Sequence, residues 1–210
     1  MTKQLLGVAL SALLFAAAAE AKFEGGFVGA AAGYSWQSMK FKSTTTTTKA
    51  TNKPKGFNVA LNAGYSDKVG SVLVGGDVRF GLGFAKHKKD ATLNGATAKV
   101  EVKNDWTAGL GLTVGTECAS DCLAFVRLGV DYDHYKTNGN STIAGISSKK
   151  FNAWSFTPGI GLKMKVDKDW SVDAMYEYKH AFKTKDASST VKFDKKPTSH
   201  GVKLGVSYYL

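Results

Sequence analysis

The sequence predicts an all-β fold: an eight-stranded, antiparallel, up-and-down β-barrel that crosses a membrane, with four long loops at one end and three short turns at the other. Three observations favour it. Eight segments place apolar residues at every second position, the connections between them differ sharply in length, and the apolar face ends in aromatic residues at two levels. A composition of 43% apolar and 11% aromatic residues excludes a disordered chain. With 210 residues and no evident linker, one folded domain is expected.

The N-terminus has the pattern of a secretory signal peptide. Leu5 to Ala19 form an almost unbroken apolar run, and Ala19-Glu20-Ala21 supplies the small-x-small pattern that signal peptidase recognises. A membrane anchor is the weaker interpretation, because a spanning helix needs about 20 residues and this run is shorter. We therefore expect residues 1–21 to be removed and residues 22–210 to form the barrel domain outside the cytoplasm.

From Lys22 onward the apolar residues recur with a period of two, which is typical of strands whose two faces meet different surroundings. Leu110 and Leu112, for example, alternate with Gly109 and Gly111. Each segment is about as long as the 9–11 residues that a tilted strand needs to cross a bilayer. The eight predicted strands are residues 27–36, 57–65, 72–84, 105–114, 124–133, 154–166, 170–179 and 202–210.

The connections between these strands alternate in length. Four are long, namely residues 37–56, 85–98, 136–150 and 182–198. Three are short, namely residues 66–70, 116–122 and 167–169. In an antiparallel array this alternation places all the long loops at the same end.

The two faces of the predicted strands differ in polarity. One face is almost continuously apolar, and because it would promote aggregation in water, we expect it to face lipid. The other carries glycine and charges, and eight strands leave it little space beyond its own side chains. Six cations and six anions fall on this lumen face and are expected to pair: Asp77, Arg79, Asp105, Arg127, Asp131, Asp133, Lys163, Lys165, Asp173, Glu177, Lys179 and Lys203.

Aromatic residues mark both ends of the apolar face, as expected where a barrel meets the two membrane interfaces. Next to the long loops they are Trp36, Phe57, Phe84, Trp106, Tyr132, Trp154 and Tyr178, and at the other end Tyr65, Trp170 and Tyr208. Just beyond the first group, the lipid-side positions become polar at Asn104, His134, Asn152, His180 and His200.

Pro158 interrupts this regular pattern. It lies in the middle of the sixth predicted strand, and a closed barrel has no free edge to accommodate a residue without an N–H group. We expect a β-bulge there, or a register shifted by one residue.

The signal peptide, the eight strands and the closing stretch Gly201–Leu210 resemble the small eight-stranded outer-membrane barrels of the OmpA/OmpX-like group. The resemblance covers the whole exported chain. It implies a monomer in the outer membrane of a Gram-negative bacterium, with the long loops outside the cell and the short turns in the periplasm. It also implies that the barrel-assembly machinery reads the last strand, which usually ends in Phe and here ends in Leu210.

Cys118 and Cys122 flank one short turn, in the stretch Cys-Ala-Ser-Asp-Cys. In an oxidising compartment we expect them to form a local disulfide. A redox-active pair is a less favoured alternative, and a zinc site is less favoured still, because no further ligand lies nearby in the sequence. No cofactor is expected.

The positive charge is concentrated in the long loops. They hold 16 Lys and 3 Asp, or +13, whereas the whole chain carries +11. The first loop has no acidic residue and contains Lys40, Lys42, Lys49, Lys53 and Lys55. Such loops are expected to pair with the phosphates of outer-membrane lipopolysaccharide, or to bind anionic host glycans or DNA through salt-dependent contacts. Without aromatic platforms for bases in the loops, specific nucleic-acid recognition is not expected.

Function is therefore predicted at the surface: membrane integrity, or adhesion through the loops. Two alternatives remain. A lipid-modifying enzyme could use Ser199 and His200 with Asp133 near the same level, although no spacing requires it, and we expect no enzyme. A narrow passive pore would need an open lumen, which twelve paired charges leave little room for.

Overall fold

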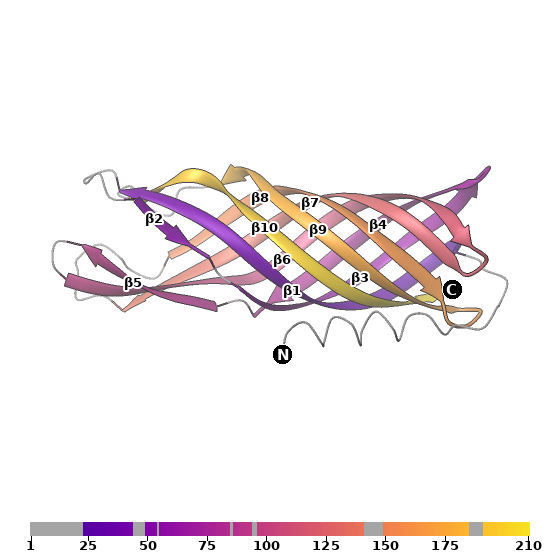
Figure 1. Ribbon diagram of the computed structural model, residues 1–210, viewed down its shortest axis with the longest axis horizontal. Helices are drawn as coiled ribbons and strands as arrows, with labels where there is room; N and C mark the ends of the chain where they lie inside the picture. The colour runs from indigo at the N-terminus through magenta and orange to yellow at the C-terminus, as the bar shows by residue number, and fades with distance from the viewer. Residues whose placement is uncertain are drawn as a thin grey trace.

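The computed structural model describes residues 23–43, 49–53, 55–84, 86–93, 96–140, 149–184 and 191–210. The predicted signal peptide lies outside these residues. They form a long cylinder of tilted antiparallel strands (Figure 1). The predicted eight-stranded barrel is confirmed, and its wall consists of β1 (Gly25–Ser43), β3 (Lys55–Val69), β4 (Val72–Gly83), β6 (Ala96–Ala119), β7 (Cys122–Asn140), β8 (Lys149–Lys165), β9 (Trp170–Thr184) and β10 (Val191–Tyr209). Within the described part of the chain, no helix is long and apolar enough to span a bilayer.

The first and last strands close the barrel. β1 pairs with β10 from Phe27–Tyr209 onward and with β3 on its other side, so every wall strand has two neighbours. Short turns at residues 70–71, 120–121 and 166–169 join strands at one end, where the C-terminus also lies (Figure 1). Gly70 has a φ of 65°, a left-handed conformation that a two-residue hairpin turn requires and glycine adopts without strain.

The strands extend well beyond the apolar segments, into regions predicted as long loops. β6 begins at Ala96 and β7 continues to Asn140, and two additional short strands, β2 (Lys49–Asn52) and β5 (Lys86–Leu93), pair with β1 and β6. The prediction missed these extensions because a period-two pattern needs one apolar face. The extension of β7 towards Asn140 has no continuous apolar face, while its backbone ladder continues to satisfy its own hydrogen bonds.

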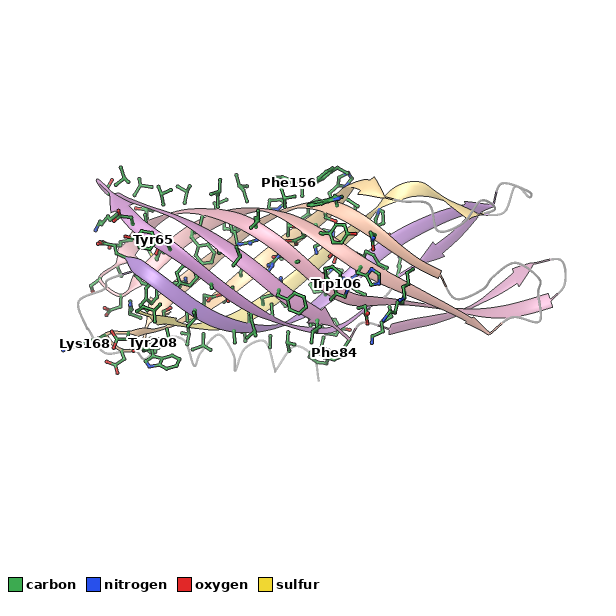
Figure 2. All side chains as sticks on the ribbon, turned by 180° about the vertical axis from the view of Figure 1, so that it is seen from behind. Tyr65, Phe84, Trp106, Phe156, Lys168 and Tyr208 are labelled. Carbon is green, nitrogen blue, oxygen red and sulfur yellow. A yellow bond between two sulfur atoms is a disulfide. The ribbon has the colours of Figure 1, made fainter. Side chains whose placement is uncertain are left out.

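The predicted alternation of faces is confirmed along the barrel wall. Leu61 and Leu110 are each 65% exposed on the outside, whereas their neighbours face inward and are small or polar: Ala60 and Asn62, and Gly109 and Gly111. Figure 2 shows Tyr65 and Tyr208 near the short-turn end, and Trp106 and Phe84 towards the long-loop end. An apolar band therefore encircles the barrel between two aromatic levels, as lipid on the outside requires.

The expectation of a β-bulge or a shifted register at Pro158 is wrong. Pro158 pairs with Leu128 of β7 in unbroken register. The side chains of β8 continue to alternate between the outside and the lumen on both sides of it. The ladder to β9 has no pairs at Thr157 and Pro158 but resumes at Gly159 in the same register. The irregularity lies nearby, between Trp154 and Ser155. The missing N–H group thus interrupts the ladder locally, and no residue is inserted.

Candidate functional site

A buried ion-pair cluster crosses the centre of the lumen. Arg79 on β4 donates through Nη1 to Glu177 on β9 (2.6 Å) and through Nη2 to Asp131 on β7 (2.8 Å). Lys203 on β10 donates to the other oxygen of Glu177 (2.9 Å). The side chains of Arg79, Asp131 and Glu177 are all less than 9% exposed. Four strands of the wall are therefore connected through charged side chains in its interior.

The cluster continues towards the long-loop end. Lys179 lies between two carboxylates, 3.0 Å from Asp131 and 2.7 Å from Asp133. Asp133 also accepts hydrogen bonds from the hydroxyls of Thr107 (2.7 Å) and Ser155 (2.9 Å). Three cations thus face three carboxylates, which makes the cluster electrically neutral and leaves it hydrogen-bonded on most sides.

A second ion pair lies closer to the short turns. Arg127 on β7 binds Asp77 on β4 with two hydrogen bonds, of 2.9 and 2.7 Å. Gly111 lies on the strand between them, and a Cβ atom there would come within 2.5 Å of the guanidinium. Glycine at this position therefore gives the arginine room to reach across β6.

Lys163 and Asp173 do not form an ion pair with each other, and both Lys163 and Lys165 lie beside aromatic rings. Lys163 donates to the hydroxyl of Tyr209 at 3.3 Å, and its ammonium lies 5.0 Å from the ring of Phe27. Lys165 donates to a backbone carbonyl at 2.9 Å, and its ammonium lies 3.9 Å from the ring of Tyr209. Asp173 lies opposite Lys163 across β8 and β9, yet no ion pair joins them. Aromatic faces therefore contribute cation–π contacts to both lysines.

Aromatic rings lie beside these lysines because an apolar plug, which was not predicted from the sequence, occupies the short-turn end of the lumen. It consists of Phe23, Phe27, Leu73, Leu123, Phe125 and Tyr209. The signal was present, because five of these residues occupy inward positions next to the short turns, on a face where glycine and other small or polar residues predominate. The plug gives the short-turn end of the lumen an apolar lining.

Two small cavities lie in the described part of the lumen. One, of about 80 Å³, lies on the short-turn side and borders Phe27, Asp173 and Tyr209. The other, of about 60 Å³, lies on the long-loop side and borders Gln37 and Asn104. Arg79 and Lys203 border both, so the ion-pair cluster forms the partition between them. Each cavity has room for several waters.

The placement of Asp105 in the lumen is wrong. A β-bulge between Asn104 and Trp106 turns its side chain to the outer surface, where it pairs with Lys136 (2.5 Å) and Lys103 (3.7 Å). The hydrogen bond from Lys136 lowers the pKa of the Asp105 carboxyl below its ordinary value. The same bulge turns Asn104 inward, where it borders the cavity on the long-loop side. Asn104 was predicted on the lipid side. The alternation of inward and outward positions predicted from the sequence fails here, because one inserted residue exchanges the two faces.

Histidine and aromatic rings adjoin one another on the outside near the long-loop end. His134 stacks on Trp106 (5.5 Å between centroids) and shares a hydrogen bond with Asn152 (2.6 Å). His200 stacks on Trp36 (6.3 Å) and is hydrogen-bonded to the hydroxyl of Tyr176 (2.5 Å). Aromatic and imidazole rings suit the membrane interface, since each has an apolar body and a polar edge.

The structure does not bring together the suggested catalytic residues Ser199, His200 and Asp133. His200 faces outward with Trp36, whereas Asp133 is fully buried in the lumen and bonded to Lys179. The barrel wall lies between them. Among the residues whose placement is described, no three His, Cys, Asp or Glu side chains are grouped to hold a metal ion.

The lysines predicted to bind anions lie at the long-loop rim. Lys53 and Lys55 are exposed beside the start of β3. Lys40 and Lys42 lie in β1 and Lys49 in β2, and their side chains are outside the described part of the molecule. Lys150, which was not singled out from the sequence, is also exposed, on β8.

Cys118 and Cys122 form a disulfide across the β6–β7 turn, with their Cα atoms 5.3 Å apart. The bond closes a very short loop, so its effect on the unfolded chain is small. Replacing both cysteines by serine is expected to lower the free energy of unfolding by about 2 kcal/mol. Urea unfolding of the wild type with and without reductant, alongside the double variant, would measure this. A variant that no longer forms a barrel would contradict a local role for the disulfide.

Comparison with known proteins identifies the family to which this architecture belongs. A family model described as the outer membrane protein beta-barrel domain matches residues 6–209. Among curated proteins, no relative matches the sequence. The fold is similar to that of OprG from Pseudomonas aeruginosa (TM-score 0.57, 14% identity, covering 92% of this chain and 100% of that one). It is also similar to Neisserial surface protein A (TM-score 0.56, 17% identity, 89% and 97%) and to AlkL in DMPC bilayers (TM-score 0.50, 14% identity, 92% and 94%).

Proposed function

Because the chain belongs to the outer-membrane protein β-barrel family, we propose that it serves as a membrane anchor for a basic rim that binds anionic groups at the cell surface. The barrel resides in the outer membrane of a Gram-negative bacterium. In this proposal the long-loop rim faces outside the cell and the short turns face the periplasm. The ligands are the phosphates of lipopolysaccharide and the carboxylates or sulfates of host glycans.

The observation that carries the proposal is the separation of charge along the barrel. The long connections hold 16 Lys and 3 Asp, and the remainder of the chain carries a net charge of −2. Lys53, Lys55 and Lys150 are exposed at the rim, whereas the short turns contain Asp121, Asp167 and Asp169. A positive field confined to one end attracts polyanions to that end alone.

The interior supports a role at the rim over a role as a pore. The ion-pair cluster around Arg79 separates the two lumen cavities, and the apolar plug around Phe125 closes the short-turn end. A solute would have to break several buried ion pairs to pass. The enzyme alternative loses its suggested residues, because Asp133 and His200 lie on opposite faces of the wall.

The test is a heparin titration of the exported chain folded in detergent. We expect binding at low salt that weakens by at least tenfold as salt rises from about 50 to about 200 mM, since each lysine contact releases a counterion. Replacing Lys53 and Lys55 together by glutamine should weaken binding about fivefold to tenfold.

The matched control replaces Lys68 and Lys168, which are exposed at the short-turn end, by glutamine. It removes the same charge and should leave heparin binding within about twofold of wild type. Folding of each sample is checked by the different gel mobility of boiled and unboiled protein. Equal losses in both variants, or no binding by a folded wild type, would refute the proposal.

A further inference from the structure

One side of the rim is arranged in rows across three neighbouring strands. The highest row, farthest from the lipid band, is Lys103, Lys136 and Lys150 on β6, β7 and β8, since Lys136 is the cross-strand partner of both other lysines. Lys150 is exposed, and the side chains of Lys136 and Lys103 are 38% and 31% exposed. Three lysines therefore form one row across the outer surface, and Asp105 is the acid that pairs with two of them among the described side chains.

The row below combines rings with hydrogen-bonding groups. Trp106, His134 and Asn152 are cross-strand partners, and the imidazole lies almost parallel to the indole, at 17°. His134 Nδ1 is engaged by Asn152 Oδ1 at 2.6 Å. Nε2 of this ring makes no hydrogen bond to any described residue. A ligand beside this row meets a ring face and a free imidazole nitrogen together.

Two further rows continue down into the lipid band. Tyr132 and Trp154 contact each other edge to face, 5.0 Å between centroids, and Trp154 is 43% exposed. Below them, Val130 and Phe156 are 40% and 43% exposed and face outward on β7 and β8. Read upward, this wall changes from aliphatic to aromatic, then to polar rings, then to lysine.

The height of these rows slightly exceeds the thickness of a membrane headgroup layer, a difference that flexible lysine side chains can span. Four residues separate Tyr132 from Lys136, about 13 Å along a strand, or about 10 Å along the membrane normal at the usual strand tilt. The headgroup region adds about 5–8 Å on each side of the hydrocarbon core. A lipid with its chains beside Phe156 would therefore present its headgroup between the aromatic row and the lysines.

We infer that the outer wall of β6, β7 and β8 is a binding site for a phosphorylated glycolipid of the outer leaflet. The acyl chains lie along Val130 and Phe156, the sugar covers the rings of Trp106 and Tyr132, and a phosphate is held by Lys136 and Lys150. Charge complementarity selects an anionic headgroup, and the aromatic row selects a sugar over a small alcohol. The phosphorylated glycolipid is one lipid partner of the basic rim, so the assignment of this site rests on the proposed function.

The test titrates diphosphoryl lipid A, and the same lipid with its phosphates removed, into the exported chain folded in detergent. Quenching of tryptophan fluorescence reports binding, because Trp106 and Trp154 lie in the site. We expect the wild type to bind the phosphorylated lipid about tenfold more tightly than the dephosphorylated one. Replacing Lys136 and Lys150 together by glutamine should abolish that preference, leaving the affinity for dephosphorylated lipid unchanged.

The control again replaces Lys68 and Lys168 by glutamine, at the opposite end of the barrel, and should keep the tenfold preference. A Lys136 and Lys150 variant that retains the preference would overturn the inference, as would one that loses affinity for both lipids equally. Heparin binding measured on the same samples separates the two proposals. A wild type that binds heparin but shows no preference for phosphorylated lipid A refutes the lipid site alone, whereas one that binds neither refutes the basic rim itself.

Discussion

Replacing Arg79 by methionine is expected to lower the free energy of unfolding by about 3–5 kcal/mol. Methionine keeps much of the side-chain volume but leaves Asp131 and Glu177, both buried, without the guanidinium that bonds each of them. Two carboxylates in a lumen of low dielectric would then keep Lys179 and Lys203 as their cations, with the Thr157 hydroxyl still bonded to Asp131. Urea unfolding in phospholipid vesicles, followed by gel mobility of unboiled samples, would measure the loss.

The cost arises from unpaired charge, so removing that charge should reverse it. Adding Asp131→Asn to the Arg79 variant restores neutrality, leaving Lys179 paired with Asp133 and Lys203 with Glu177, and is expected to recover most of the lost stability. The matched surface pair is Lys68 and Glu117, 3.0 Å apart and each more than one-third exposed, where Lys68→Met should cost no more than about 1 kcal/mol. An Arg79 variant as stable as the Lys68 variant would show that the central cluster contributes little to the fold.

The barrel itself could be predicted from the sequence because lipid and lumen impose opposite polarity on successive residues. Leu110 and Gly111 show this rule within two positions, and it holds along the wall strands except at bulges such as the one beside Asp105. Strand ends could not be predicted, because beyond the lipid the ladder of β7 continues to Asn140 with no apolar face to mark it. The signal peptide stays a prediction, since residues 1–21 lie outside the described part of the chain.

The side chains that face the lumen could be predicted only where the alternation along the strand was not interrupted by a bulge. Arg79 and Asp131 lie where their positions in the strands place them, although nothing in the sequence specifies that they bond to each other. Asp105 was misplaced because a single bulge reverses inside and outside, and a bulge leaves no compositional mark at this site. The aromatic partners of Lys163 and Lys165 depend on Phe27 and Tyr209 meeting across the closed barrel, which is a long-range contact.

Replacing Leu110 by arginine is expected to destabilise the barrel in vesicles by about 2–4 kcal/mol. Leu110 is 65% exposed on the outside, in the middle of β6, between the aromatic level at Trp106 and the short turns. If water surrounded the barrel, a charge at so exposed a position would be neutral or would improve solubility. In lipid it must be drawn to an interface or remain poorly solvated, so the sign of the effect identifies the solvent of the outer face.

The matched position is Val69, which is 67% exposed but lies at the end of β3, next to the turn at Gly70 and beyond Tyr65. The same substitution there should cost less than about 1 kcal/mol, because the guanidinium reaches headgroups and water. Urea titrations of both variants in the same vesicles give the comparison directly. Equal costs at the two positions would mean that exposure alone decides the effect, and the apolar band could no longer be assigned to the hydrocarbon core. A penalty at Leu110 alone would place that core between the two aromatic levels, with both the lysine rim and the short turns outside it.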